Sequence, residues 1–144
     1  MEKKQYKEMH DVIIEECGRA LDAIDADDVL RYIGMIQSAE KVFFVGVGRV
    51  LLSLEAMAKR YAHLGIRAVI VGEITEPAIT PRDVLVVGSG SGETLFPAGI
   101  ARKAKAAGAK VIHIGSNPSS GLRDVADLFL RIPVESRAKL EDEI

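Results

Sequence analysis

Short apolar runs recur along the chain from residue 42 onward, and turns rich in glycine or polar residues separate them. The runs occupy residues 42–45, 68–71, 84–87, 111–114 and 128–132. Continuous apolar runs of this length are typical of strands buried on both faces of a parallel sheet. Helical periodicity fills residues 50–64 and 95–107, and we expect a short helix at 122–126. This alternation predicts an α/β fold in which a parallel sheet of five strands carries helices on both faces.

A helical pattern precedes the first run. Apolar residues recur at three- and four-residue spacing from Tyr6 to Ile24 and again over residues 29–36. This spacing predicts two amphipathic helices, with Asp25 as a capping residue between them. The chain then divides into a helical arm, a core and a C-terminal tail, at 1–38, 39–134 and 135–144. The arm packs either on a neighbouring subunit or on its own sheet.

Composition and charge narrow the classes of function. With 144 residues, 48% of them apolar, the chain is long enough for one domain with its own core. The net charge of −2 and the lack of a basic block argue against nucleic acid as a partner. The single cysteine, Cys17, and the charged first residues indicate a reducing compartment and no signal peptide. Since no apolar run approaches the roughly 18 residues of a membrane span, we expect a soluble cytoplasmic protein.

The segment 89–94 has the composition of a phosphate-binding loop. It joins an apolar strand to a helix and reads Ser-Gly-Ser-Gly-Glu-Thr. Glycines let the backbone approach an anion, and the first N–H groups of a helix, which have no intrahelical partner, favour negative charge. The expected phosphate ligands are Ser89, Gly90, Ser91, Gly92 and Thr94. The alternative is a tight strand-to-helix turn that binds nothing.

Nucleotides and metals are not expected. The loop lacks the lysine of a GxxxxGK[ST] motif, so a single phosphate on a small molecule fits better than a nucleoside triphosphate. A second glycine turn, at 46–49, lacks the third glycine of a dinucleotide fingerprint, and Glu73 lies 27 residues after Gly46 instead of about 20. We therefore expect no cofactor and assign Gly46, Gly48 and Arg49 to substrate binding, with a surface ion pair as the alternative for Arg49. No two histidines or cysteines have metal-ligand spacing, so we expect no metal.

Several motifs together resemble a known family. They are Phe-Val-Gly-Val-Gly-Arg at 44–49, His-Leu-Gly at 63–65, Val-Gly-Glu at 71–73, Pro-Ala-Ile at 77–79, the strand and loop at 83–94, Gly-Ala-Lys-Val-Ile at 108–112 and Ile-Pro at 132–133. The segment 40–133 resembles the sugar isomerase (SIS) domain family and, within it, the 6-phospho-3-hexuloisomerases. The resemblance implies a three-layer, flavodoxin-like fold with strand order 2-1-3-4-5 and assembly into a dimer or tetramer.

The resemblance also implies an activity. Enzymes of this branch interconvert 3-hexulose 6-phosphate and fructose 6-phosphate, with no metal or nucleotide. A base moves a proton between C2 and C3 through a cis-enediol, and hydrogen-bond donors stabilise the enediolate oxygens.

Two departures from the family pattern bear on this activity. Val50-Leu51 stands where the family has Ser-Gly after its first turn, so one hydroxyl is lost. The family's Pro-Met-Gly/Ser-Thr/Ser-x-Phe-Glu segment, whose glutamate is a favoured base, is absent from this chain, which indicates a truncated chain or a reduced domain. The alternatives to an isomerase are a module that binds or senses a phosphosugar without converting it, and a fragment of the enzyme.

The candidate catalytic residues are His63, Glu73 and Glu93. The resemblance implies that His63 lies near the site, from a neighbouring subunit, where it could open the sugar ring or transfer a proton. The alternative for His63 is a helix C-terminal cap. Glu73 follows the second strand and could act as the base, or it could cap the loop after that strand. Glu93 could act as a base or serve as an ordinary first-turn acid of the following helix.

Overall fold

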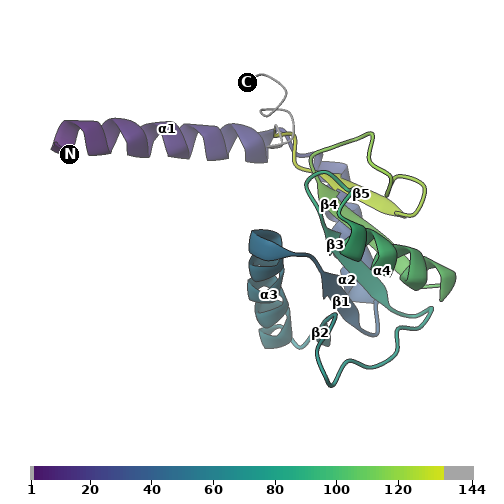
Figure 1. Cartoon of the computed structure of the whole chain (residues 1–144). Helices are drawn as coiled ribbons and strands as arrows, with labels where there is room; N and C mark the ends of the chain where they lie inside the picture. Colours follow the sequence, from purple (N-terminus) through teal and green to yellow (C-terminus); the bar gives the residue numbers. More distant parts are fainter. Residues whose placement is uncertain (1, 135–144) are drawn as a thin grey trace.

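The computed structural model describes residues 2–134 and contains a five-stranded, all-parallel sheet with helices on both faces (Figure 1). The helices and strands, in chain order, are α1 (Lys3–Asp22), α2 (Ala26–Ser38), β1 (Val42–Val45), α3 (Gly48–His63), β2 (Ala68–Ile70), β3 (Val84–Gly88), α4 (Leu95–Ala106), β4 (Lys110–Gly115) and β5 (Leu128–Arg131). The strand order is β2-β1-β3-β4-β5, which confirms the predicted order. From β1 the chain adds β2 on one side and then β3, β4 and β5 on the other, so the strand order reverses between β1 and β3. Ligands of such sheets bind beyond the carboxyl ends of the strands at that point.

Successive strand residues point to opposite faces and build two separate cores. Phe44, Val86 and Ile112 pack on one face, where α2 and α3 cover the sheet. Phe43, Leu85 and Val111 pack on the other face against the alanines of α4. All six side chains are almost completely buried, so the expected three-layer arrangement is confirmed.

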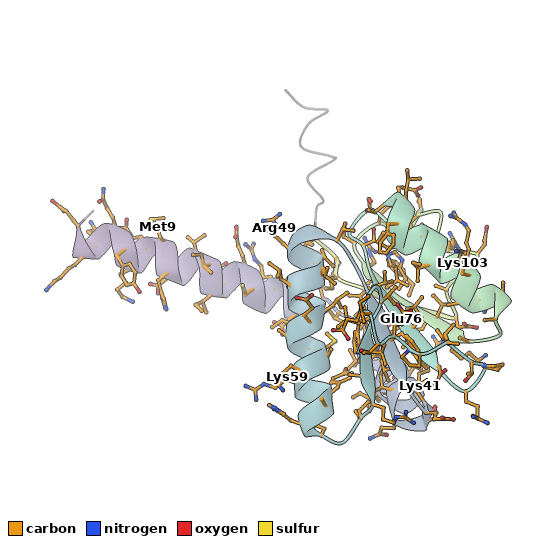
Figure 2. The ribbon with its side chains drawn as sticks, turned by 60° about the horizontal axis from the view of Figure 1, so that its bottom comes forward. Met9, Lys41, Arg49, Lys59, Glu76 and Lys103 are labelled. Atoms are coloured by element: carbon orange, nitrogen blue, oxygen red, sulfur yellow. The ribbon has the colours of Figure 1, made fainter. Side chains whose placement is uncertain are left out.

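The two N-terminal helices differ in their packing. Helix α2 begins at Asp25, whose carboxylate accepts hydrogen bonds from the N–H groups of Asp27 and Asp28, and it buries Tyr32 and Ile36 against the sheet. Helix α1 buries no residue and projects away from the sheet, as Figures 1 and 2 show from two directions. The division at 38 and 134 stays a prediction, and the tail at 135–144 lies outside the described residues. Every helix in residues 2–134 is too short or too polar to cross a membrane.

The prediction of a short helix at 122–126 is wrong. These residues form consecutive turns, with Leu122 fully buried. The chain must then enter β5, and Asp127 ties it to β4 by exchanging two hydrogen bonds with the backbone of Val111, at 2.8 and 2.9 Å. A helix this short gains too few hydrogen bonds to offset its nucleation cost, so the tertiary ties determine the conformation.

A buried ion pair holds the amino edge of the sheet. The Asp83 carboxylate, just before β3, lies 3.1 Å from Lys41 Nζ, and both side chains are buried. It also accepts hydrogen bonds from the backbone N–H of Lys41 and from the N–H and hydroxyl of Thr80. Burial alone would raise the pKa of Asp83, but the hydrogen bonds from Thr80 and the pairing with Lys41 hold that pKa below its ordinary value.

Replacing Asp83 by asparagine should lower the free energy of unfolding by about 3 kcal/mol, because the buried Lys41 then keeps only the more distant carboxylate of Glu40, at 3.7 Å. The folded-state pKa of Asp83 lies below its unfolded value, so its stabilisation is complete above about pH 4 and is lost as the pH falls further. Urea unfolding at neutral pH and at pH 3 measures both effects.

The matched control is Asp11→Asn, which breaks an exposed ion pair with Lys7 on α1. We expect no measurable change in stability from it. Equal stabilities of Asp83→Asn and wild type at neutral pH would contradict the structural role of the buried pair.

Candidate functional site

Two glycine-containing turns lie side by side at the carboxyl edge of the sheet. Strands β1 and β3 are hydrogen-bonded neighbours, with Val45 paired to Val87, so both chains leave the sheet at the same level. The first turn of α3 packs on the end of β3: a Cβ atom at Gly88 would lie 2.5 Å from Val50 Cγ1. Only glycine leaves room for this contact, which places the residue 46–49 turn beside the residue 89–94 loop.

Two helix N-termini start at these turns without side-chain caps. Thr94 is the N-cap of α4 and Val47 is the N-cap of α3, and neither side chain accepts a hydrogen bond from its helix. The first N–H groups of both helices therefore remain available as donors. Their dipoles give this edge a positive potential, which suits an anion.

The hydroxyl oxygens of the loop organise the loop itself. Ser89 Oγ accepts a hydrogen bond from the N–H of Gly92 at 3.0 Å and lies 3.3 Å from Thr94 Oγ1. Ser91 Oγ accepts from the N–H of Glu93 at 3.2 Å. Ser91 uses only an oxygen lone pair in its contact, so its O–H can still donate to a ligand. The O–H of Thr94 can do so when Ser89 is the donor in the Ser89–Thr94 contact.

The loop carbonyls are held by donors from the turn after β4. Gly90 O accepts hydrogen bonds from the N–H groups of Ser116 and Asn117 and from Ser116 Oγ, at 3.0 to 3.1 Å. Ser91 O accepts from Asn117 Nδ2 at 3.1 Å. Carbonyl oxygens repel an anion, so tying them to protein donors leaves the N–H and O–H groups of the loop to face it.

A buried histidine holds the carbonyl of the first loop residue. His113, in the middle of β4, is 1% exposed, and its Nε2 lies 2.8 Å from Ser89 O. Its ring stacks on Phe129 with 4.9 Å between the ring centroids. Burial lowers the pKa of His113, although the hydrogen bond to Ser89 opposes this shift.

Glu93 makes a structural contact in the described chain. Its Oε1 accepts a hydrogen bond from the N–H of Gly121 at 2.5 Å and joins the loop to the segment before β5. Glu93 precedes the N-cap Thr94, so the alternative of a first-turn acid of α4 is wrong, and its role as a base stays a prediction.

The other predicted site residues are dispersed. His63 is the last residue of α3, so it lies a full helix of 16 residues, about 24 Å, from Gly48 at the start. Glu73 lines a hollow of about 660 Å³ together with Lys41, at the amino end of β1. Arg49 is exposed in the first turn of α3 (Figure 2), at the same edge of the sheet as the 89–94 loop. One chain therefore brings together the loop and the turn 46–49 but not His63, and the role of Glu73 stays a prediction.

Sequence reasoning missed three residues that shape the loop: His113, Ser116 and Asn117. His113 stood within an apolar run, and the two others stood in what the sequence showed only as a turn. The predicted strand order could have pointed to His113, because it places β4 beside β3, the strand that leads into the loop. In the structure His113 pairs with Val87, close to the end of β3.

A parallel sheet with uncapped helix N-termini at its switch point defines an α/β fold whose carboxyl edge suits an anion. The SIS domain model matches residues 35–140. The chain belongs to the SIS domain family.

Individual relatives agree with this assignment. The chain is 38% identical over 135 residues to an uncharacterized protein of Archaeoglobus fulgidus, covering 93% of this chain and 73% of that protein. It is 35% identical over 121 residues to 3-hexulose-6-phosphate isomerase of Bacillus subtilis, covering 84% of this chain and 65% of the enzyme. A Methanococcus jannaschii protein, whose crystal structure inferred a function of 3-hexulose-6-phosphate isomerase, superposes with a TM-score of 0.73 at 32% identity, covering 79% of this chain and 64% of that one. The chain thus spans only part of each relative.

Replacing Gly92 by alanine should lower the free energy of unfolding by at least about 2 kcal/mol. Gly92 has φ +72°, which disfavours other residues, and a Cβ atom there would overlap Ser120 and lie 3.1 Å from His113 Cε1. Urea unfolding measures the change.

The control is Gly99→Ala in α4, where a Cβ atom meets nothing within 4 Å and φ is helical. It should stabilise the protein by up to about 1 kcal/mol. If both variants were equally stable, the tight packing under the loop would be disproved.

Proposed function

We propose that the protein is a phosphosugar isomerase that interconverts 3-hexulose 6-phosphate and fructose 6-phosphate. The observation that carries this proposal is the loop at 89–94. The carbonyls of its first three residues are tied to protein donors, while the N–H groups of Gly90, Ser91 and Thr94 have no acceptor within the described residues. Relatives at 33 to 36% identity that bear the name 3-hexulose-6-phosphate isomerase support the choice of sugar.

The phosphate binds to the loop through Ser89, Gly90, Ser91, Gly92 and Thr94. Two uncapped helix N-termini meet the anion, and no lysine or metal is needed to neutralise it. Gly46 and Gly48 let the first turn approach the sugar, and Arg49 reaches a phosphate or sugar oxygen. Binding energy from the phosphate, far from the reacting carbons, orients C2 and C3 for proton transfer.

The proton transfer between C2 and C3 needs a base, and the one carboxylate within the loop is that of Glu93. Glu93 is engaged with Gly121, and His63 lies at the far end of α3. We assign His63 of a second copy to ring opening or proton transfer, with Glu73 and Glu93 as the candidate bases. A cis-enediol forms and collapses to the other ketose, and donors of the two turns stabilise its oxygens.

Helix α1 supports assembly into a dimer or tetramer. Its apolar residues are 53 to 68% exposed, namely Tyr6, Met9, Val12, Ile13, Ile14 and Leu21. An amphipathic helix of 20 residues with no buried side chain has an apolar face that needs a partner. A second copy of the chain fits this role, because the proposed site also requires one.

Fructose 6-phosphate should raise the melting temperature of the wild type but not of a Ser91→Ala/Thr94→Ala double variant. Each hydroxyl lost from a charged oxygen weakens binding by about 1.5 to 3 kcal/mol. Ser38→Ala, at the opposite edge of the sheet, is the matched control and should keep the full ligand-dependent shift. An undiminished shift in the double variant would place the phosphate elsewhere.

A coupled assay for fructose 6-phosphate formation from 3-hexulose 6-phosphate tests the activity itself. Turnover that is lost in the double variant supports the isomerase. Saturable binding of fructose 6-phosphate without turnover would reject it and leave the phosphosugar-binding module.

Ile13→Glu should shift the protein toward monomer in sedimentation velocity, weakening association by at least about tenfold, because a charge replaces an apolar side chain that the proposed assembly would bury. Lys4→Gln changes the net charge by the same amount on the opposite side of α1 and should leave the oligomer intact. A wild type that stays monomeric at high concentration would contradict the assembly.

A further inference from the structure

His113 is a polar side chain in an otherwise apolar face of the sheet. It pairs with Val87 of β3 and with Phe129 of β5, and it is 1% exposed. A buried imidazole costs desolvation that an apolar side chain of β4 would avoid. Its one hydrogen bond to the rest of the described chain goes to the loop, at Ser89 O.

The structure around the ring is shaped to permit this contact. A Cβ atom at Gly115 would overlap Ser89 O and lie 2.6 Å from His113 Nε2. A Cβ atom at Gly92 would lie 3.1 Å from His113 Cε1. Glycine at these two positions therefore lets the ring lie directly beneath the loop.

The N–H, the carbonyl and the hydroxyl of Ser89 all make hydrogen bonds within the protein. Its N–H donates to Ile114 O at 3.1 Å, while its carbonyl accepts from His113. Its hydroxyl in turn accepts the N–H of Gly92 and so sets the path of the loop toward α4. Displacing Ser89 O would turn a carbonyl toward the anion and break this chain of contacts.

We propose that His113 is a positioning residue that holds the loop at 89–94 in its anion-binding conformation by donating Nε2–H to Ser89 O. This proposal rests on the proposed function, since it takes the loop to be the phosphate site. The imidazole does not touch the ligand; it acts through the Ser89 peptide. Because a carbonyl can only accept, Nε2 must carry the proton, and the neutral ring is the Nε2–H tautomer.

The tautomer can be tested in the wild type without any substitution. Long-range ¹H–¹⁵N NMR at neutral pH should show His113 protonated at Nε2, with an N–H proton that exchanges slowly. Saturating inorganic phosphate should shift this signal, because the loop and the ring are connected through Ser89. A neutral ring protonated only at Nδ1 would overturn the proposal.

Variants separate positioning from packing. His113→Leu removes the donor and should weaken binding of fructose 6-phosphate and of inorganic phosphate by about tenfold in calorimetry. His113→Gln can place an amide N–H near the position of Nε2 and should recover most of that loss. Phe129→Leu loses the stacked ring but keeps the hydrogen bond, so it should lower the melting temperature while changing affinity less than about twofold.

Amide hydrogen exchange distinguishes failure of this proposal from failure of the proposed function. In His113→Leu, exchange in the loop at 89–92 should accelerate while the middle of α4 stays protected, whether or not any ligand binds. If the wild type bound no phosphate but its loop still depended on His113, the proposed function would fail alone. If His113→Leu left both loop exchange and affinity unchanged, or if Phe129→Leu lost affinity equally, the positioning role would be rejected. If His113→Leu does not fold, the affinity of His113→Gln for phosphate and the tautomer of His113 in the wild type test the positioning role instead.

Discussion

The hydrogen bonds that hold three backbone carbonyls determine what the carboxyl edge of this sheet can bind. The carbonyls of Ser89, Gly90 and Ser91 all point to donors from β4 and the turn after it. A glycine loop without such ties could present carbonyls as easily as N–H groups, because glycine restricts neither orientation. With these three carbonyls held, donors of the loop, of the start of α4 and of the start of α3 can face an anion at this edge.

This arrangement depends on the strand order. Placing β4 next to β3 puts His113 beside the strand that leads into the loop, and placing β1 on the other side brings the second glycine turn against Gly88. At the opposite edge, the buried pair of Asp83 and Lys41 holds the start of β3 beside β1. Strands β1 and β3 are therefore held at both ends, and the loop is supported by the most buried part of the sheet.

Binding and catalysis are distributed differently over the molecule. Every group that we assign to the phosphate lies on one chain, whereas His63 lies a helix length away and Glu93 is engaged in a structural contact. Helix α1 exposes an apolar face along its length and projects away from the sheet, so assembly supplies both its partner and the missing catalytic group in our proposal (Figure 2).

Local patterns in the sequence determined the elements and the kind of site. Buried strands appear in the sequence as apolar runs, and glycine with hydroxyl residues at 89–94 indicated the loop between β3 and α4 that we propose as the anion site, because both signals arise from neighbouring residues. Contacts between distant residues were decided only by the tertiary structure. The contacts of Asp127 and the burial of Leu122 favour turns where the sequence predicted a helix. His113 Nε2 lies at hydrogen-bond distance from Ser89 O, 24 positions earlier in the chain. Such contacts depend on which strands become neighbours, and a residue's own sequence surroundings carry no record of that.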